Sequence, residues 1–207
     1  ERISNDLCSL KPNEDRPAIA VRLVIGPDGR KKSHSFHRIL MRSMAKLSYN
    51  SAQSMVDGSS EASSSELTRK ALKPLWQAWT LQQSERQERA PLDLNLPERK
   101  LKLRPDGSLD YVYLPPRLEA HRLVEDFMIM ANVAAAETLE HHHTPLIYRV
   151  HDEPSLEKLR GFKEVLASIG FKMTLQGALR PDFFNSILKK IEGSPHQAFV
   201  NDVVLRS

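Results

Sequence analysis

One stretch of this chain, residues 118–139, carries polar groups that a helix serving only as core would not need. Glu125 and Asn132 are seven residues apart, which is two helical turns, so their side chains share one face; His121 precedes Glu125 by four residues. A carboxylate accepts hydrogen bonds and an amide both donates and accepts them, so this face could serve a polar ligand. A solvent-facing stripe beside an apolar face explains the same spacing, and the spacing alone favours that second interpretation.

Apolar residues recur at helical spacing through the same stretch, which predicts one long helix over residues 118–139. They are Leu123, Val124, Phe127, Met130, Ala131, Val133 and Ala134. Burying a carboxylate or an amide among these residues would be costly unless neighbouring groups satisfied its hydrogen bonds. The polar residues therefore need either solvent, a ligand or buried partners.

Four segments of the chain, in this order, resemble sequence elements of the RNase II / RNase R exoribonuclease family, whose catalytic part is the RNB domain. They are ISNDLCSLKPNEDR at Ile3–Arg16, RSMAKLSYNSAQ at Arg42–Gln53, HRLVEDFMIMANVAAAETL at His121–Leu139 and PLIYRVHDEPSLEKL at Pro145–Leu159. The resemblance implies that residues 1–207 form the central portion of an RNB catalytic domain. In that family an aspartate cluster precedes this portion, and an arginine-rich SPIRRY element and an S1 region follow it. We expect these regions to lie outside this chain.

The activity that the resemblance implies is Mg²⁺-dependent, processive 3′→5′ hydrolysis of single-stranded RNA to nucleoside 5′-monophosphates. The Mg²⁺ ligands are expected to lie outside this chain, because it contains no aspartate-rich run, and the chain alone is expected to be inactive. The alternative is a non-catalytic RNA-binding or scaffold protein that keeps an RNB-like core. In either case we expect a cytoplasmic, monomeric full-length protein with no membrane partner.

The resemblance assigns roles to three residues of the segments above. Glu125 matches a glutamate near the 3′ nucleotide, where a carboxylate can accept a hydrogen bond from a ribose 2′-OH and so distinguish RNA from DNA. Asp126 is adjacent but points about 100° away around the helix, so it ranks second. Tyr49 matches a catalytic-site tyrosine near the scissile phosphate, where its phenol can donate to a phosphate oxygen. Without the resemblance, a core tyrosine with a satisfied hydroxyl is the better interpretation of Tyr49.

Further substrate-binding residues follow from the same matches. Arg149 and His151 belong to the YRVH element; Arg149 could contact phosphate, orient the site or pair with a carboxylate. Asn5 and Ser9 match the first segment and are expected to line the channel. Leu94 stands where many relatives have an aromatic residue that clamps the terminal bases. Stacking on an aromatic ring contributes about 1–3 kcal/mol per base, so a leucine offers an apolar wall with less of that energy.

The overall composition is compatible with an intracellular protein that binds a polyanion. The net charge is +4 and the pI is near 9.2, but the basic residues are spread out, and a mildly basic solvated surface is an equally good explanation. The single cysteine, Cys8, excludes an internal disulfide framework and indicates a reducing compartment. No run of eighteen apolar residues and no secretory leader are visible in the sequence.

Other candidate sites have simpler structural explanations. His141–His143 could suggest a metal, but three consecutive histidines cannot all face one ion from a helix. Asp93, Asp106 and Asp110 are interpreted as turn residues. Trp76 and Trp79 are three residues apart on a predicted helix, and core packing is a better interpretation than a base-stacking platform.

The remaining pattern mixes hairpins with helices and predicts an α+β domain. Two hairpins are expected, with strands at 17–25 and 31–41 and at 101–104 and 109–114. Helices are expected at 45–56, 66–89 and 155–169, from Pro181 to Gly193, and from Pro195. Pro74 implies a kink or a helix start within 66–89. Residues 57–65, rich in Gly and Ser, are expected to form a mobile loop, and residues 146–150 a short extended segment.

Overall fold

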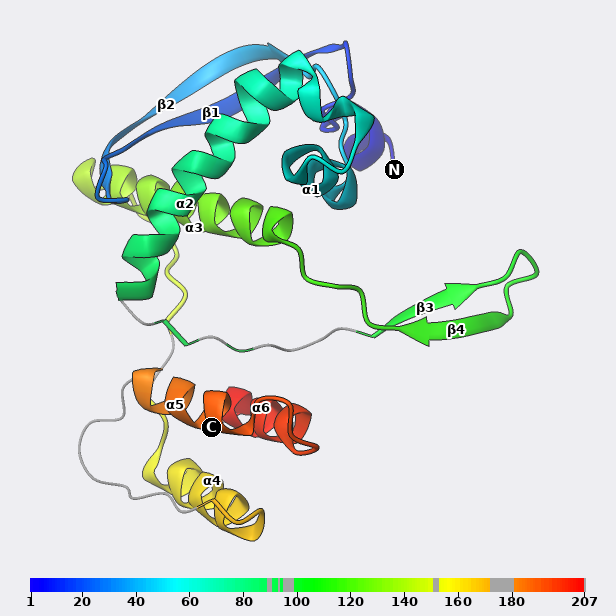
Figure 1. Cartoon of the computed structure of the whole chain (residues 1–207). Coiled ribbons are helices and arrows are strands. Elements are labelled where there is room, and N and C mark those ends of the chain that lie inside the picture. Colours follow the sequence, from blue (N-terminus) through cyan, green and yellow to red (C-terminus); the bar gives the residue numbers. More distant parts are fainter. Residues whose placement is uncertain (89–90, 93, 95–98, 151–152, 172–180, 207) are drawn as a thin grey trace. The chain divides into compact units, whose positions relative to one another are not determined.

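The computed structural model describes residues 1–88, 91–92, 94, 99–150, 153–171 and 181–206. The chain divides into two compact units, each built from two chain segments (Figure 1). Unit 1 comprises residues 1–86 and 117–146, and unit 2 comprises residues 87–116 and 147–207. Helices and two antiparallel hairpins occur together, which confirms the predicted α+β class.

A long antiparallel hairpin dominates the first part of unit 1, as predicted. Strand β1 (Asp15–Ile25) pairs with β2 (Lys31–Arg42), and their register runs from Asp15 opposite Arg42 to Ile25 opposite Lys31. The turn between them places Gly29 at φ +73°, and a Cβ there would lie 2.1 Å from the carbonyl oxygen of Leu81. Only glycine combines this backbone conformation with such a close approach.

The predicted helix at 45–56 begins later, as α1 (Tyr49–Asp57), because Ser48 caps it by accepting a hydrogen bond from the Ser51 N–H across 3.1 Å. It follows a short helical turn, η1 (Ile3–Leu7), and the hairpin along the chain. The loop predicted at 57–65 contains a 3₁₀ helix, η2 (Glu61–Ser64). Reciprocal hydrogen bonds between Ser60 and Ser63 cap η2, so serines taken as loop formers instead satisfy helix ends.

The helix predicted at 66–89 contains a π-helical turn, η3 (Thr68–Leu72), followed by α2 (Lys73–Glu88). The irregular turn lies immediately before Pro74. Proline has no N–H to donate to the carbonyl four residues earlier, and its ring clashes with that carbonyl. A wider π turn at this place relieves the clash, so the sequence correctly marked the position of the irregularity.

Helix α3 (Glu119–His141), predicted at 118–139, begins one residue later and ends two residues later than expected, and it crosses α2 (Figure 1). The core between the two helices contains Trp76, Trp79, Ala120 and Leu123, with Ala52 and Val56 of α1 packed against it. The prediction that both tryptophans are core residues is therefore confirmed, and neither is a base-stacking platform. None of the helices within the described residues is both long and apolar enough to cross a lipid bilayer.

The described part of unit 2 contains the second predicted hairpin and three helices. Strand β3 (Lys100–Leu103) pairs antiparallel with β4 (Leu109–Tyr113). Helices α4 (Leu156–Ser168), α5 (Pro181–Ile191) and α6 (Gln197–Arg206) follow, close to their predicted positions. Ser155 caps α4 as predicted. The predicted extended segment 146–150 belongs to no strand.

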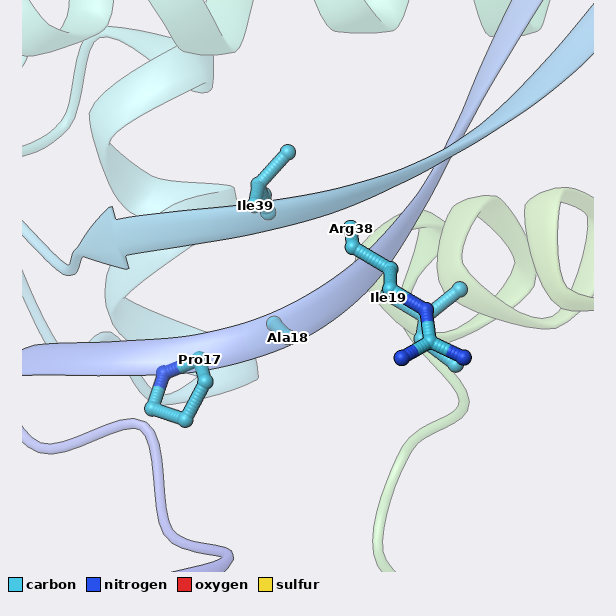
Figure 2. A pocket seen from close by; sticks show the side chains of 5 residues that line it. All are labelled: Pro17, Ala18, Ile19, Arg38 and Ile39. Atoms are coloured by element: carbon cyan, nitrogen blue, oxygen red, sulfur yellow. The ribbon is translucent and has the colours of Figure 1, made fainter.

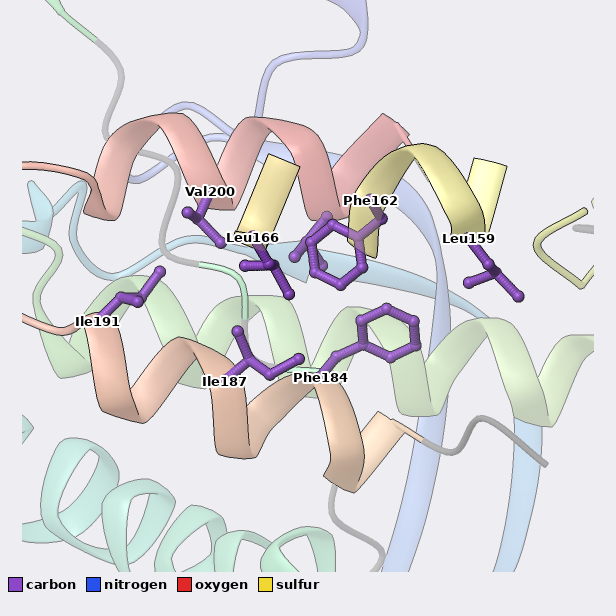
Figure 3. Packing of buried hydrophobic residues seen from close by; sticks show 8 residues of the cluster. Leu159, Phe162, Leu166, Phe184, Ile187, Ile191 and Val200 are labelled. Carbon is purple, nitrogen blue, oxygen red and sulfur yellow. The ribbon is translucent and has the colours of Figure 1, made fainter. Parts of the chain in front are cut away.

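The three helices of unit 2 share one apolar core (Figure 3). Its buried members are Leu159, Phe162, Leu166, Phe184, Ile187, Ile191, Val200 and Val204. Rings of Phe162 and Phe184 lie 5.8 Å apart at their centroids. Full burial of such a side chain contributes about 1.5–3 kcal/mol relative to exposure, so this cluster is the main stabilising contact among α4, α5 and α6.

Candidate functional site

An aromatic stack joins the first residue of α1 to the first turn of α3. The Tyr49 and His121 rings lie 4.0 Å apart at their centroids with 24° between their planes, and Tyr49 remains 44% exposed. Nδ1 of His121 accepts a hydrogen bond from the Leu118 N–H (3.2 Å), and Oε1 of Gln53 accepts one from the Ala120 N–H (3.0 Å). These bonds satisfy two backbone donors at the start of α3 and fix the imidazole against Tyr49. The predicted catalytic tyrosine is thus partly accessible and held in place.

Glu125 lies one turn further along α3 and is exposed to solvent. Its carboxylate forms an ion pair with Arg117 (2.5 Å between Nη2 and Oε2), and both side chains are largely exposed. Asn132, on the same face, is also exposed. The polar face predicted from the spacing is therefore a surface, which extends from His121 past Glu125 to Asn132 and includes the exposed Met128.

Asp126, the neighbour of Glu125, is buried, with 1% of its surface exposed. Oδ2 of Asp126 accepts hydrogen bonds from the indole N–H of Trp79 (2.8 Å) and from the Gln83 amide, and Oδ1 pairs with Arg86. A buried carboxylate needs such compensation. Because its partners are all on α2, Asp126 joins α2 to α3, and Glu125 is the accessible carboxylate of the pair.

Sequence reasoning missed the partners of Asp126. Trp79, Gln83 and Arg86 recur at intervals of four and three, so they share one face of α2. That spacing was visible in the sequence, and it could have indicated a polar contact. It could not show which helix the face meets, because Asp126 lies 47 residues after Trp79.

Asn5 and Ser9, predicted to line a channel, lie near the N-terminus of unit 1. Asn5 is exposed on η1, and its Oδ1 accepts a hydrogen bond from Ser4 (3.3 Å). The Ser9 carbonyl accepts a hydrogen bond from Nε of Arg16 (3.2 Å). Asp6, between them, accepts a hydrogen bond from Lys11 (2.5 Å), which holds the pKa of this carboxyl below its usual range.

The other predicted substrate-binding residues belong to unit 2. Arg149 is exposed in the irregular segment that precedes α4. Leu94 is half-buried and packs against the core of α4, α5 and α6, so its side chain contributes to that core. His151 and Asp93 lie outside the described residues. The predicted site residues are therefore divided between the two units, with Tyr49, Glu125 and Asn5 in unit 1.

Neither the histidine run nor the remaining aspartates form a metal centre among the described residues. No group of three or more His, Cys, Asp or Glu side chains there could hold a metal ion. His141 and His142 rings meet edge to face at 5.3 Å. Asp106 accepts hydrogen bonds from Ser108 in the β3–β4 turn, as expected of a turn residue. Asp110 was also predicted to be a turn residue, but it lies within β4 and pairs with Arg104. The described residues thus do not fit a Mg²⁺ site.

A shallow hollow of about 570 Å³ lies on the β1–β2 hairpin (Figure 2). It is lined by Pro17, Ala18, Ile19, Arg38 and Ile39. Figure 2 shows Ile39 on the opposite side of the hairpin from Ile19 and Arg38, as strand alternation requires. Arg38 is the one charged side chain of this lining, which therefore lacks the convergent polar groups of a small-molecule site.

Known proteins resemble the whole chain. Ribonuclease R of Aquifex aeolicus is 34% identical over 210 residues, which cover 100% of this chain and 30% of that protein. Ribonuclease R of Escherichia coli is 27% identical over 208 residues, covering 100% of this chain and 26% of that protein. The chain therefore spans less than a third of the length of these two relatives.

Solved structures have the same fold. The apo form of Mycoplasma genitalium RNase R superposes with a TM-score of 0.89 at 24% identity, covering 100% of this chain and 32% of that chain. The same enzyme in complex with ribose-methylated single-stranded RNA gives the same TM-score, identity and coverage. The RNB domain model matches residues 1–207. This match covers the complete chain, which therefore belongs to the RNB domain family.

Proposed function

We propose that this chain is part of a 3′→5′ exoribonuclease that hydrolyses single-stranded RNA to nucleoside 5′-monophosphates. The family membership and the two Ribonuclease R relatives support this reaction class. Single-stranded RNA as the substrate is supported by the similar structure of an RNase R bound to that polymer. We expect the full-length protein to act as a cytoplasmic monomer.

The observation that carries the proposal is the surface formed by Tyr49, His121 and Glu125. Tyr49, at the start of α1, stacks on His121, which lies one helical turn before Glu125 on α3. Both the phenol and the carboxylate are accessible. In our proposal the Tyr49 hydroxyl donates a hydrogen bond to a phosphate oxygen near the scissile bond. The Glu125 carboxylate accepts a hydrogen bond from a ribose 2′-OH, which DNA lacks.

Arg117 is the partner of the Glu125 carboxylate in the absence of RNA. Its guanidinium pairs with Glu125 across 2.5 Å, and exposed pairs of this kind contribute at most about 1 kcal/mol. A ribose hydroxyl can therefore reach the carboxylate without a large cost. Arg117 also keeps the carboxylate in one place before RNA arrives, and it adds positive charge beside a polyanion.

Arg149, Asn5 and Leu94 have supporting roles in the proposal. Arg149 is exposed and could contact phosphate or orient neighbouring groups. Asn5 is exposed and could line the path of the RNA. Leu94 is an apolar wall whose packing against the core of unit 2 limits its movement.

In this proposal the residues that bind the metal ions lie outside the described residues. Two bound Mg²⁺ ions would supply an activated water and stabilise charge at the phosphate. Their ligands are carboxylates, and the described residues offer no cluster of them. In our proposal this chain therefore binds and orients RNA, and the aspartate cluster of the full-length protein holds the ions.

The test uses the full-length protein with Mg²⁺ and two poly(A) substrates, one labelled uniformly to detect released mononucleotides and one labelled at the 5′ end to show the direction of shortening. Stepwise release of mononucleotides from the 3′ end, lowered in Tyr49→Phe, is the expected result, because this variant removes the hydroxyl and keeps the stack on His121. RNA binding without any turnover would overturn the proposal in favour of a non-catalytic RNA-binding or scaffold protein. Full activity in Tyr49→Phe would overturn the role of the phenol alone.

A further inference from the structure

We propose that one face of the β3–β4 hairpin binds single-stranded RNA by base stacking. This face, here called the tyrosine–lysine face, consists of Lys100, Lys102, Tyr111 and Tyr113. The choice of RNA rests on the proposed function. The surface itself belongs to unit 2, whereas Tyr49 and Glu125 belong to unit 1.

Strand register places the four side chains on one face. Lys100 is the partner of Tyr113 and Lys102 is the partner of Tyr111 in the antiparallel pair. Directly opposite residues project to the same side of a sheet, and so do residues two apart on one strand. The hairpin therefore alternates two lysines and two tyrosines on this side and places Leu101 and Val112, also partners, on the other.

The two rings are exposed and already ordered relative to each other. Tyr111 is 49% exposed and Tyr113 is 42% exposed, and their centroids lie 5.7 Å apart in an edge-to-face arrangement. Nζ of Lys102 lies 5.2 Å from the centroid of Tyr111, within the range of a cation–π contact. Each ring offers an apolar surface to a base, and the ammonium beside Tyr111 can reach the phosphate of a stacked nucleotide.

The charge of the hairpin complements a polyanion. Residues 99–114 carry four cationic side chains and two carboxylates. Both carboxylates are engaged by hairpin residues: Asp110 pairs with Arg104 and Asp106 accepts hydrogen bonds from Ser108. Among the described residues of the hairpin, no carboxylate therefore stands beside Lys100 and Lys102 on the tyrosine–lysine face.

This composition favours RNA over a protein as the occupant. Lysine is depleted at the centres of protein interfaces, whereas cations interleaved with aromatic rings are typical of surfaces that bind single strands. A protein segment would instead be expected to cover the opposite side, where Leu101 is 64% exposed and Val112 is 49% exposed. Binding of RNA should therefore depend on Tyr111 and Tyr113, whereas binding of a protein should depend on Leu101 and Val112.

The experiment measures binding of a fluorescent twelve-nucleotide oligo(A) to the 207-residue chain by anisotropy. The combined change Tyr111→Ala and Tyr113→Ala should weaken binding at least about fivefold. Tyr111→Phe with Tyr113→Phe keeps both rings and should stay within about twofold of the unchanged chain. Stacking does not require a 2′-OH, so oligo(dA) should lose affinity in parallel in the alanine variant.

A salt series tests the lysines separately. Lys102→Ala should reduce the slope of log affinity against log salt by about 0.7, the value expected for loss of one phosphate contact on a single strand. Lys102→Arg should retain the slope. Circular dichroism and thermal unfolding of every variant establish that the helices of unit 2 remain folded.

Two results would overturn the inference. One is unchanged oligo(A) affinity in the double alanine variant. The other is an equal loss of affinity in Val112→Ala, which would assign the effect to the apolar side or to hairpin folding, as expected for a protein occupant. The proposed function fails separately, when the full-length protein releases no mononucleotides, and that assay does not depend on either tyrosine variant.

Discussion

The indole N–H of Trp79 donates a hydrogen bond to Oδ2 of Asp126 across 2.8 Å, joining α2 to α3 inside unit 1. Gln83 and Arg86, on the same face of α2, complete the contacts of this carboxylate. The contact fixes the rotation of α3 about its axis, because adjacent residues of a helix point about 100° apart. Asp126 is buried and Glu125 is exposed to solvent, as the proposed function requires.

Asp126→Ala is expected to destabilise unit 1 by about 2–4 kcal/mol. Removal of the carboxylate leaves the Trp79 and Gln83 donors unsatisfied and Arg86 without its partner, but Arg86 is 30% exposed, which moderates the cost. Urea unfolding of the 207-residue chain measures the change. Glu125→Ala, one residue away and exposed, is the matched control and should cost less than about 1 kcal/mol. Equal losses of unfolding free energy in the two variants would contradict the conclusion that Asp126 stabilises unit 1 and Glu125 does not.

The turn of the first hairpin gives a second test. Gly29→Ala places a Cβ 2.1 Å from the Leu81 carbonyl oxygen at a φ of +73°, so the turn must move away from α2. Gly58→Ala has a similar φ of +81° but open space around the Cβ. We expect about 1–2 kcal/mol of destabilisation for Gly58→Ala and more for Gly29→Ala. Thermal unfolding of both variants compares them, and a Gly29→Ala cost no larger than that of Gly58→Ala would refute the close contact.

The turn of the second hairpin should respond to acid. Hydrogen bonds from the Ser108 hydroxyl and N–H lower the pKa of Asp106 below its usual value of about 3.9. A lowered pKa in the folded turn means that ionised Asp106 stabilises it above the unfolded pKa, and that this contribution is lost as pH falls through the folded pKa. Protection of the hairpin amides, taken as their exchange rate relative to that of an unfolded reference at the same pH, should therefore fall below about pH 4. Asp106→Asn should abolish this dependence, and its persistence in that variant would assign it to another group.

Much of the secondary structure was predictable because its signals are local. Ser155 caps α4, and Pro181 opens α5, as the sequence indicated. The 3₁₀ helix η2 was missed because a serine-rich segment reads as a loop unless its hydroxyls find nearby backbone groups, as those of Ser60 and Ser63 do. Such pairing depends on a turn geometry that composition does not specify.

The candidate site was less predictable, because its geometry depends on contacts between distant elements. The spacing of Glu125 and Asn132 correctly indicated a shared face, yet left open whether that face was buried. The answer came from Asp126 and its partners on α2, which no local pattern reveals. The exposure of Tyr49 was also not predictable, because it depends on the stack with His121 from another helix.

The 207-residue chain alone should release no mononucleotides from labelled poly(A) in Mg²⁺. The described residues provide no cluster of carboxylates to hold the two ions that the reaction requires. The full-length protein, assayed in parallel, serves as the positive control. Turnover by the purified chain that is abolished by EDTA would show that a metal site lies within it.

Glu125 provides the sharpest prediction for the full-length protein. If its carboxylate accepts a hydrogen bond from the ribose 2′-OH, Glu125→Ala removes an interaction worth roughly 1.5–3 kcal/mol that only RNA can make. RNA turnover should fall about ten- to a hundredfold, while DNA cleavage relative to RNA rises.

The ion pair with Arg117 supplies the control, because it is the competing explanation for any effect of Glu125. Arg117→Ala breaks the same pair but leaves the carboxylate in place. A structural role for the pair predicts that both variants lower thermal stability together and keep the RNA-to-DNA preference. A ribose-binding role predicts that only Glu125→Ala changes the preference. Rates on matched RNA and DNA oligonucleotides, measured with thermal unfolding of both variants, separate the two roles, and an unchanged preference in Glu125→Ala rules out the assignment.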